Sequence, residues 1–178
     1  MLKKILSYGV VAGLIAGIPL CIMAVTSDND ATRSYGMLIG YLTMLIALSA
    51  VFVAIKRYRD AELGGVIRFW PALALGIGIS IVAGVIYALA WEATLDITHM
   101  DFAGAYANSL IEQQKASGVS GEALARFTAE METFKTEYSN PLYRLPMTFI
   151  EIFPVGVLVS LVSAALLRNS RFLAVRRA

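Results

Sequence analysis

The sequence predicts an all-α membrane protein, a four-transmembrane-helix bundle with an extramembrane helical hairpin between spans three and four. The first observation is composition: of 178 residues, 58% are hydrophobic and only 16% are charged, whereas soluble domains carry about a quarter charged residues. The second is that the apolar residues gather in four runs, each reaching the roughly 20 helical residues that cross a bilayer core. The net charge of +2 is too small to indicate a nucleic-acid partner.

We expect a single membrane domain over residues 1–178, with spans at about 5–25, 35–55, 69–91 and 145–167 and an insert at about 96–144. Trp70 and Trp91 bracket the third run, as aromatic residues do at the two membrane interfaces. Pro71 suits the first turn of that helix, where its missing N–H has no intrahelical partner to lose.

Basic residues in the short segments beside the spans indicate the orientation, because the cytoplasmic side carries an excess of Lys and Arg. One side is strongly basic, and its only acids are Asp60 and Glu62. The basic residues on that side are Lys3, Lys4, Lys56, Arg57, Arg59, Arg68, Arg168, Arg171, Arg176 and Arg177. The other side mixes a few basic residues with many acids. Both termini are therefore predicted to be cytoplasmic, with the insert on the opposite side.

Small residues recur at four-residue spacing within the apolar runs. Helices in lipid associate by close packing, and small side chains permit that close approach. The predicted packing residues are Gly9, Gly13 and Gly17 in the first run, Gly36 and Gly40 in the second, and Gly76, Ser80 and Gly84 in the third. Two interpretations stay open: packing within one chain, or a homodimer through the glycine stripe of the first span.

The insert reads as two amphipathic helices, at roughly 101–116 and 122–138, separated by a break at 117–121. Their apolar residues recur every three or four positions: Phe102, Tyr106 and Leu110 in the first helix, and Leu124, Phe127, Met131 and Phe134 in the second. Such a stripe needs a surface against which it is buried. We expect a periplasmic hairpin that caps the bundle, or alternatively docks an envelope protein.

Two acids, Glu92 and Glu151, need an explanation, because ionisable side chains inside a membrane are costly and are functional candidates by default. Glu92 lies at the end of the third run, and Glu151 lies six residues after Leu145, roughly 9 Å into its span. In a structural interpretation, Arg144 pairs with Glu151 or a hydroxyl such as that of Tyr87 donates to it. In a second interpretation, Glu151 carries protons beside a helix interrupted at Pro154.

A metal site is a third interpretation. If the helix continues past Trp91, Asp96 and His99 fall four and seven residues after Glu92, on the same helical face. Carboxylates and imidazole suit a divalent metal, and Glu151 would complete the set. The compact histidine pair of a helical zinc protease is missing. Apart from such a metal, we expect no cofactor.

Four strings together resemble a known family: GYLTMLIAL at 40–48, IKRYRD at 55–60, YALAWE at 87–92 and PMTFIEIFPVG at 146–156. They are similar to the bacterial membrane-protein family catalogued as domain of unknown function 4199, over about residues 3–167. The resemblance implies a four-span inner-membrane protein from a Gram-negative bacterium and brings no activity with it. Glu92 and Glu151 fall inside these strings.

Three hypotheses follow for the function. The first is a non-enzymatic structural or accessory envelope component whose outer hairpin caps the bundle or docks a partner. The second is a proton or small-ion channel or transporter that uses Glu151. The third is a metal-dependent membrane enzyme that uses Glu92, Asp96, His99 and Glu151. The expected partners are the lipid bilayer and either a second copy or an envelope protein, without nucleic acid.

Overall fold

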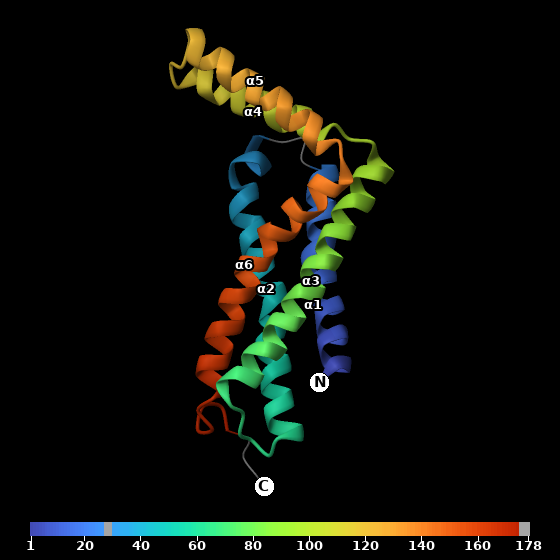
Figure 1. The fold of residues 1–178 in the computed structure, drawn as a ribbon, viewed down its shortest axis with the longest axis vertical. Helices are drawn as coiled ribbons and strands as arrows, with labels where there is room; N and C mark the ends of the chain where they lie inside the picture. Colours follow the sequence, from blue (N-terminus) through green and yellow to red (C-terminus); the bar gives the residue numbers. More distant parts are fainter. Residues whose placement is uncertain (27–29, 175–178) are drawn as a thin grey trace. The chain divides into compact units, whose positions relative to one another are not determined.

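The computed structural model describes the backbone of residues 1–26 and 30–174, and the side chains of residues 1–25 and 38–174. This part of the chain is all-helical, as predicted (Figure 1). Six helices follow one another: α1 (Leu2–Thr26), α2 (Asp30–Glu62), α3 (Phe69–Thr98), α4 (Phe102–Ala116), α5 (Gly121–Tyr138) and α6 (Pro141–Leu167).

Four of these helices, α1, α2, α3 and α6, are long and apolar enough to cross a membrane. The qualifying segments are Leu2–Val25, Leu38–Glu62, Phe69–Thr98 and Pro141–Leu167. Large apolar side chains also cover the outside of these helices: Trp70 is 74% exposed and Ile46 is 67% exposed. A soluble protein rarely exposes so much contiguous apolar surface. Composition, helix length and surface therefore indicate a membrane protein.

The helices run beyond the apolar segments. α2 continues to Glu62, beyond residue 55, where the second span was predicted to end. An ion pair between Lys56 and Asp60, four residues apart at 2.7 Å, supports this last part of the helix. Gly64 and Gly65 then turn the chain with φ of 64° and 91°, a conformation that side chains other than glycine rarely adopt.

The interruption expected at Pro154 is not observed, because α6 runs from Pro141 to Leu167 without a break. Pro141 occupies the first position of α6, where proline is favoured. Pro146 and Pro154 lie inside the helix, and each removes a backbone donor without ending it. The same is true of Pro19 in α1.

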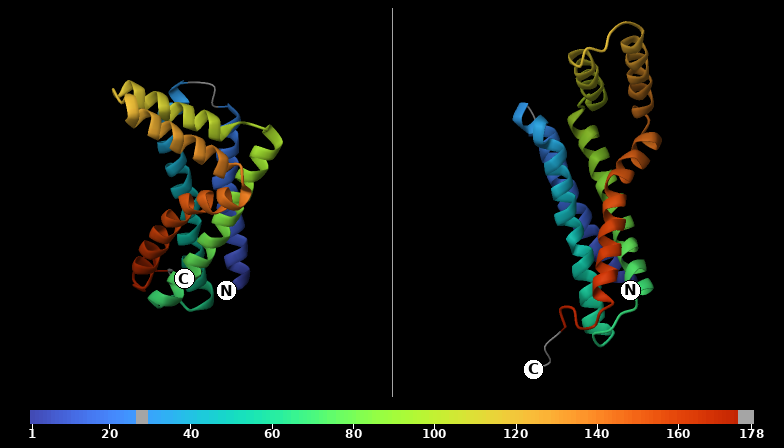
Figure 2. Two further views of the ribbon diagram at one scale, coloured as in Figure 1. Left: turned by 45° about the horizontal axis from the view of Figure 1, so that its top comes forward. Right: turned by 90° about the vertical axis from the view of Figure 1, so that its left-hand side faces the viewer.

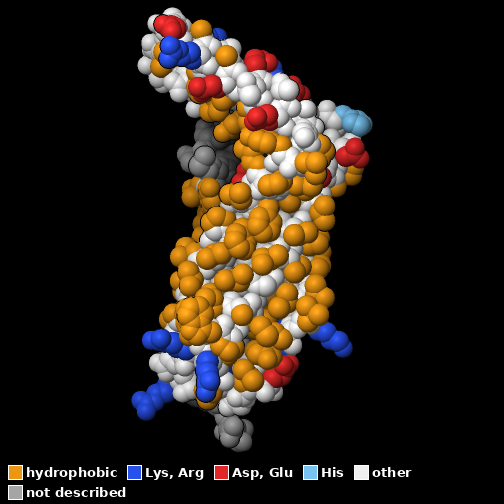
Figure 3. Space-filling view, in the orientation of Figure 1, with side chains coloured by type: hydrophobic (Ala, Val, Ile, Leu, Met, Phe, Trp, Pro, Cys, Tyr) orange, Lys and Arg blue, Asp and Glu red, His pale blue; other side chains and the backbone are white. Residues whose placement is uncertain are grey.

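The chain divides into two compact units. The four-helix unit comprises Met1–Trp91 and Thr148–Ala178, and the hairpin unit comprises Glu92–Met147. On the face shown in Figure 3, hydrophobic side chains cover the four-helix unit, and Lys and Arg side chains gather at one of its ends. In the hairpin unit, α4 and α5 form an antiparallel pair (Figure 2).

In the four-helix unit, the glycine stripe of α1 packs on α3 of the same chain. A β-carbon at Gly9 would lie 2.5 Å from Val82 Cβ, and one at Gly13 would lie 2.6 Å from Ile86 Cβ. At Gly17 the nearest atom would be Ala90 Cβ, at 2.9 Å. Only a residue without a side chain permits this approach, so the stripe is used within one chain.

Helices α3 and α6 pack through a reciprocal exchange of serine and glycine. A β-carbon at Gly76 would meet the Ser160 hydroxyl at 2.7 Å, and one at Gly156 would meet the Ser80 hydroxyl at 2.6 Å. The two hydroxyl oxygens are 3.3 Å apart, and each hydroxyl also donates to a carbonyl four residues earlier on its own helix. No polar group is left unsatisfied by this close packing.

The remaining predicted packing residues behave differently from one another. A β-carbon at Gly84 would meet the ring of Phe149 at 2.6 Å, so this glycine also accommodates α6. Among the described residues, no atom of another helix lies within 4 Å of a β-carbon placed at Gly40, so the prediction that it packs against a helix is wrong. The surroundings of Gly36 lie outside the described side chains.

Candidate functional site

A bidentate ion pair between Glu92 and Arg144 lies at the base of the hairpin unit. Arg144 Nε donates to Glu92 Oε1 at 2.6 Å, and Arg144 Nη2 donates to Glu92 Oε2 at 2.5 Å. The two side chains are only 19% and 14% exposed, respectively. Paired donors that match both carboxylate oxygens make the strongest class of ion pair. Here the pair joins the last turns of α3 to the first turn of α6.

The same guanidinium reaches α5. Arg144 Nη1 donates to the carbonyl oxygen of Tyr138 at 3.0 Å, and the guanidinium carbon lies 5.6 Å from the centre of the Tyr138 ring. Arg144 therefore connects the end of α3, the end of α5 and the start of α6. These are the segments through which the chain enters and leaves the hairpin.

The predicted pairing of Arg144 with Glu151 is wrong. The two residues are seven positions apart, so helical periodicity alone makes them suitable partners. In the structure both Glu92 oxygens already accept from Arg144, and its third amino group is engaged by Tyr138. The three nitrogens of the guanidinium are thus directed to Glu92 and to the Tyr138 carbonyl, and not to Glu151.

An aromatic cluster forms the core of the hairpin unit. Phe102 and Tyr106 of α4 meet Phe134 and Tyr138 of α5, with four ring-to-ring distances between 5.3 and 5.9 Å. Tyr138 is only 6% exposed. The other stripe residues, Leu110, Leu124, Phe127 and Met131, are half-buried. The two apolar stripes are thus buried largely by packing against each other.

Local signals position both hairpin helices. Asp101 caps α4, since its Oδ1 accepts from the backbone N–H of Gly104 at 2.8 Å. Gly118 and Gly121 carry the turn between the helices with φ of 85° and 62°. On the outside, the charges pair within their own helices: Lys115 with Glu112, Arg126 with Glu122 and Lys135 with Glu132.

A cavity of about 740 Å³ lies at the hairpin base. Its polar lining consists of Glu92, Asp96, His99, Asp101, Lys135, Tyr138, Ser139 and Arg144. Most of these groups already have partners: Glu92 and Arg144 hold each other, Asp101 caps α4 and Lys135 pairs with Glu132. Asp96 and His99 are exposed at the rim.

The residues of the predicted metal site do not assemble into one. Helix α3 ends at Thr98, and His99 follows it with φ of 50°, so His99 leaves the helical face that was expected to carry it. Glu92 has both oxygens engaged by Arg144. Among the described residues, no group of three or more His, Cys, Asp or Glu side chains could hold a metal ion.

Glu151 belongs to the four-helix unit, where it lies exposed on α6. Its carboxylate has no hydrogen-bond or ion-pair partner among the residues that the structure describes, so the predicted bond from Tyr87 is also not observed. Tyr87 itself is buried in α3, at 2% exposure. A proton or ion pathway through the middle of the helices would require the carboxylate to lie inside, whereas it lies on the surface.

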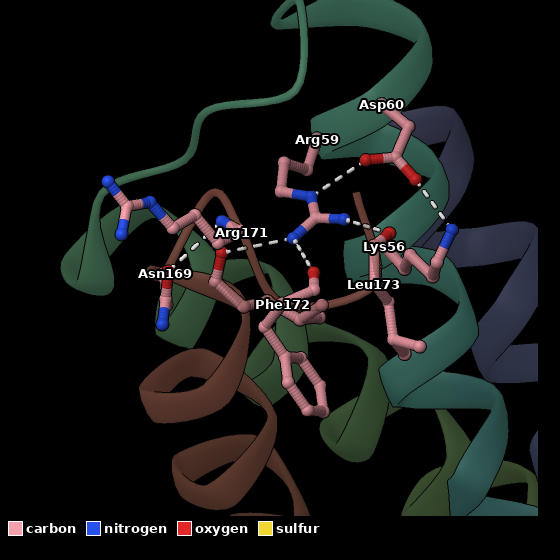
Figure 4. A network of polar contacts seen from close by, with 8 residues as sticks. Lys56, Arg59, Asp60, Asn169, Arg171, Phe172 and Leu173 are labelled. Atoms are coloured by element: carbon pink, nitrogen blue, oxygen red, sulfur yellow. Dashed lines mark hydrogen bonds and ion pairs between the residues drawn. The ribbon is translucent and has the colours of Figure 1, made fainter. Parts of the chain in front are cut away.

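Arg59 has a role that the sequence interpretation missed. Its side chain is fully buried, and its guanidinium donates to the carbonyls of Phe172 at 2.9 Å and Leu173 at 3.0 Å (Figure 4). Arg59 Nε also donates to Asp60 at 2.7 Å, and Asp60 in turn accepts from Lys56. The network fastens the segment after α6 to the end of α2. The available signal was Asp60, one of only two acids on the basic side of the predicted membrane protein.

Comparison with known proteins adds a family and no activity. No curated protein matches the chain, and no solved structure matches it. A family model described as "Protein of unknown function (DUF4199)" matches residues 7–169, which is most of the sequence and includes both Glu92 and Glu151. The chain therefore belongs to this family of proteins of unknown function, as the four sequence strings indicated.

Proposed function

We propose that this protein is a non-enzymatic accessory component of a bacterial inner membrane, and that its hairpin unit docks a protein partner in the periplasm. The observation that carries the proposal is the Arg144 contact set, which ties α3, α5 and α6 together at the hairpin base. A binding element that is rigid before binding loses less conformational entropy when it binds. The aromatic cluster serves the same purpose further along the hairpin.

Charge distribution supports the proposed orientation, with both termini in the cytoplasm. At the basic end of the four-helix unit both acids are neutralised within the chain: Asp60 pairs with Lys56 and Arg59, and Glu62 pairs with Lys4 at 2.7 Å. The exposed Arg57, Arg68, Arg168 and Arg171 remain as a surplus. Such a surplus of basic residues is typical of the cytoplasmic side.

Cysteine labelling tests the orientation. In a Cys21→Ala background, Ser120→Cys places a thiol between α4 and α5, and Ser170→Cys places one after α6. A membrane-impermeant maleimide applied to spheroplasts is expected to label position 120 at once and position 170 only after permeabilisation. The reverse pattern would overturn the proposed orientation.

Photo-crosslinking tests the docking role. A photoreactive amino acid replaces Glu130, which is exposed on α5 and lies on its own helix away from the Arg144 contacts. Cells are expected to yield one discrete protein adduct, lost in Arg144→Glu and recovered in the Glu92→Arg/Arg144→Glu double variant, which restores the ion pair with reversed sign. Adducts that do not depend on the ion pair would contradict a preorganised docking surface.

A further inference from the structure

Two polar side chains lie unpartnered on the apolar surface of the four-helix unit. Glu151 is exposed on α6, and Tyr41 is 48% exposed on α2. Neither makes a hydrogen bond or an ion pair with any residue in the described part of the chain. In contrast, the buried side chains of Ser80, Ser160 and Arg59 in this unit all make hydrogen bonds.

These two side chains lie at the same level along their helices. Helices α2 and α6 meet at Leu48, whose Cδ2 lies 3.6 Å from a β-carbon placed at Gly156, and again at Arg59, which contacts the Leu167 carbonyl at 3.5 Å. The two contacts are eleven residues apart along α2 and also eleven residues apart along α6. The two helices therefore run side by side in the same direction. With a rise of about 1.5 Å per residue, Tyr41 and Glu151 lie about 10 and 8 Å before the Leu48 contact.

Between Tyr41 and Phe52, the face of α2 that meets α6 is covered only from Leu48 onward. Tyr41, Leu45, Leu48 and Phe52 follow one another at helical spacing and share this face. Leu48 is fully buried, and the Phe52 ring lies 6.5 Å from the Phe172 ring that follows α6. In contrast, Tyr41 and Leu45 are 48% and 45% exposed.

On α6, the exposed side that carries Glu151 also carries an apolar residue. Leu158, seven positions later and therefore on the same helical face, is 59% exposed. One copy of the chain thus presents, at a similar level along the two helices, an acceptor from α6 and a donor from α2, with apolar side chains on both helices. The small-residue faces that often mediate helix association are already used within the chain, by α1 on α3 and by α3 on α6.

We propose that this surface is a homodimer interface, in which Tyr41 of each copy donates a hydrogen bond to Glu151 of the other. A two-fold axis makes the contact self-complementary, so one surface supplies both bonds. The second copy removes the cost of an unpaired carboxylate and hydroxyl in an apolar medium, and Leu45 and Leu158 pack around the bonds. The inference rests on the proposed membrane placement and is independent of the docking role of the hairpin.

Disulfide crosslinking between differently tagged copies tests the interface in native membranes. In a Cys21→Ala background, Tyr41→Cys on one copy and Glu151→Cys on the other are expected to give a mixed dimer on oxidation. Ile18→Cys with Ile46→Cys, at exposed apolar positions of α1 and α2, is the matched control and is expected to give none. The proposal is overturned if both pairs fail, if both crosslink equally, or if a chain carrying both cysteines crosslinks only within itself.

Counting photobleaching steps of labelled protein in supported bilayers provides a second measurement. Tyr41→Phe removes both donors of the symmetric interface and is expected to weaken dimerisation about eightfold. Tyr143→Phe, at a tyrosine that is 40% exposed in the hairpin unit, should leave it unchanged. A monomeric wild type, or equal dimerisation in the wild type and Tyr41→Phe, would overturn the interface. Neither result bears on the docking of a periplasmic partner.

Discussion

The two units of this protein are stabilised in different ways. The four-helix unit packs closely through glycine and serine, and besides its buried core it carries many large apolar side chains that face outward. The hairpin unit packs aromatic rings against one another, and its charges form ion pairs on the outside. The first pattern suits lipid, in which burying apolar side chains gives little driving force. The second suits water, in which such burial is the main driving force.

Substitution of Arg59 should give the largest loss of stability. Arg59→Ala leaves the carbonyls of Phe172 and Leu173 without this donor and Asp60 without one of its two cations, and we expect a loss of about 3–5 kcal/mol of unfolding free energy. Unfolding in mixed micelles with increasing SDS measures it. Arg57→Ala is the control, because that side chain is exposed and donates to the Tyr8 hydroxyl at 3.3 Å, at the surface. Equal losses in the two variants would contradict a structural role for the buried guanidinium.

The packing of α1 on α3 is tested next. Gly13→Leu should destabilise the four-helix unit by about 2–3 kcal/mol or prevent folding, because any β-carbon at this position would collide with Ile86. Gly40→Leu introduces the same side chain where no neighbour lies within 4 Å. The same SDS titration should therefore separate the two variants. Similar stabilities would show that the helices separate readily, and that close packing does not hold this unit together.

In the hairpin unit, Arg144→Ala should cost about 2 kcal/mol, because it leaves a largely buried Glu92 without its partner. Hydrogen exchange resolves the effect locally, and the amides of α4 and α5 should lose protection while those of α1 keep theirs. Arg126→Ala is the matched control, since that side chain is 75% exposed in its pair with Glu122, and such surface pairs contribute little. Unchanged hydrogen exchange in Arg144→Ala would contradict the idea that the ion pair keeps the hairpin rigid.

The smallest expected effect is that of substituting Glu151, which should not change proton transport. Because its carboxylate lies exposed on α6, Glu151→Gln is expected to leave proton flux through reconstituted liposomes unchanged from wild type. A pH-sensitive dye trapped inside the liposomes measures the flux, with protein-free liposomes as the baseline. Flux present in the wild type and lost in the variant would restore the ion-pathway hypothesis.

Local patterns in the sequence were sufficient for the helices. Run length and hydropathy depend on neighbouring residues, so the four long helices and both hairpin helices could be predicted, and the resemblance to the family was confirmed. The spacing of Gly9, Gly13 and Gly17 identified a packing face, although it could not say which helix would cover it. Periodicity also admitted Gly40, because spacing does not reveal whether a neighbour is present.

Such local patterns could not predict which residues pair when they lie far apart in the sequence. Arg144 had two acids within reasonable reach, and only the fold shows that Glu92, 52 residues earlier, takes both contacts. Arg59 looked like one more basic residue beside a span, because its carbonyl partners lie more than 100 residues later in the chain. Its burial depends on a return of the chain that no local signal encodes.

The serine and glycine exchange between α3 and α6 has a mechanical consequence. Each serine side chain fills the space beside a glycine of the other helix. The two helices can therefore slide along each other only if both serines leave these spaces together. A slide of one full helical turn is about 5.4 Å, and no intermediate position restores the fit. These are the two helices that lead into and out of the hairpin. A pull on the hairpin would therefore tilt or rotate the pair rather than shift one helix along the other.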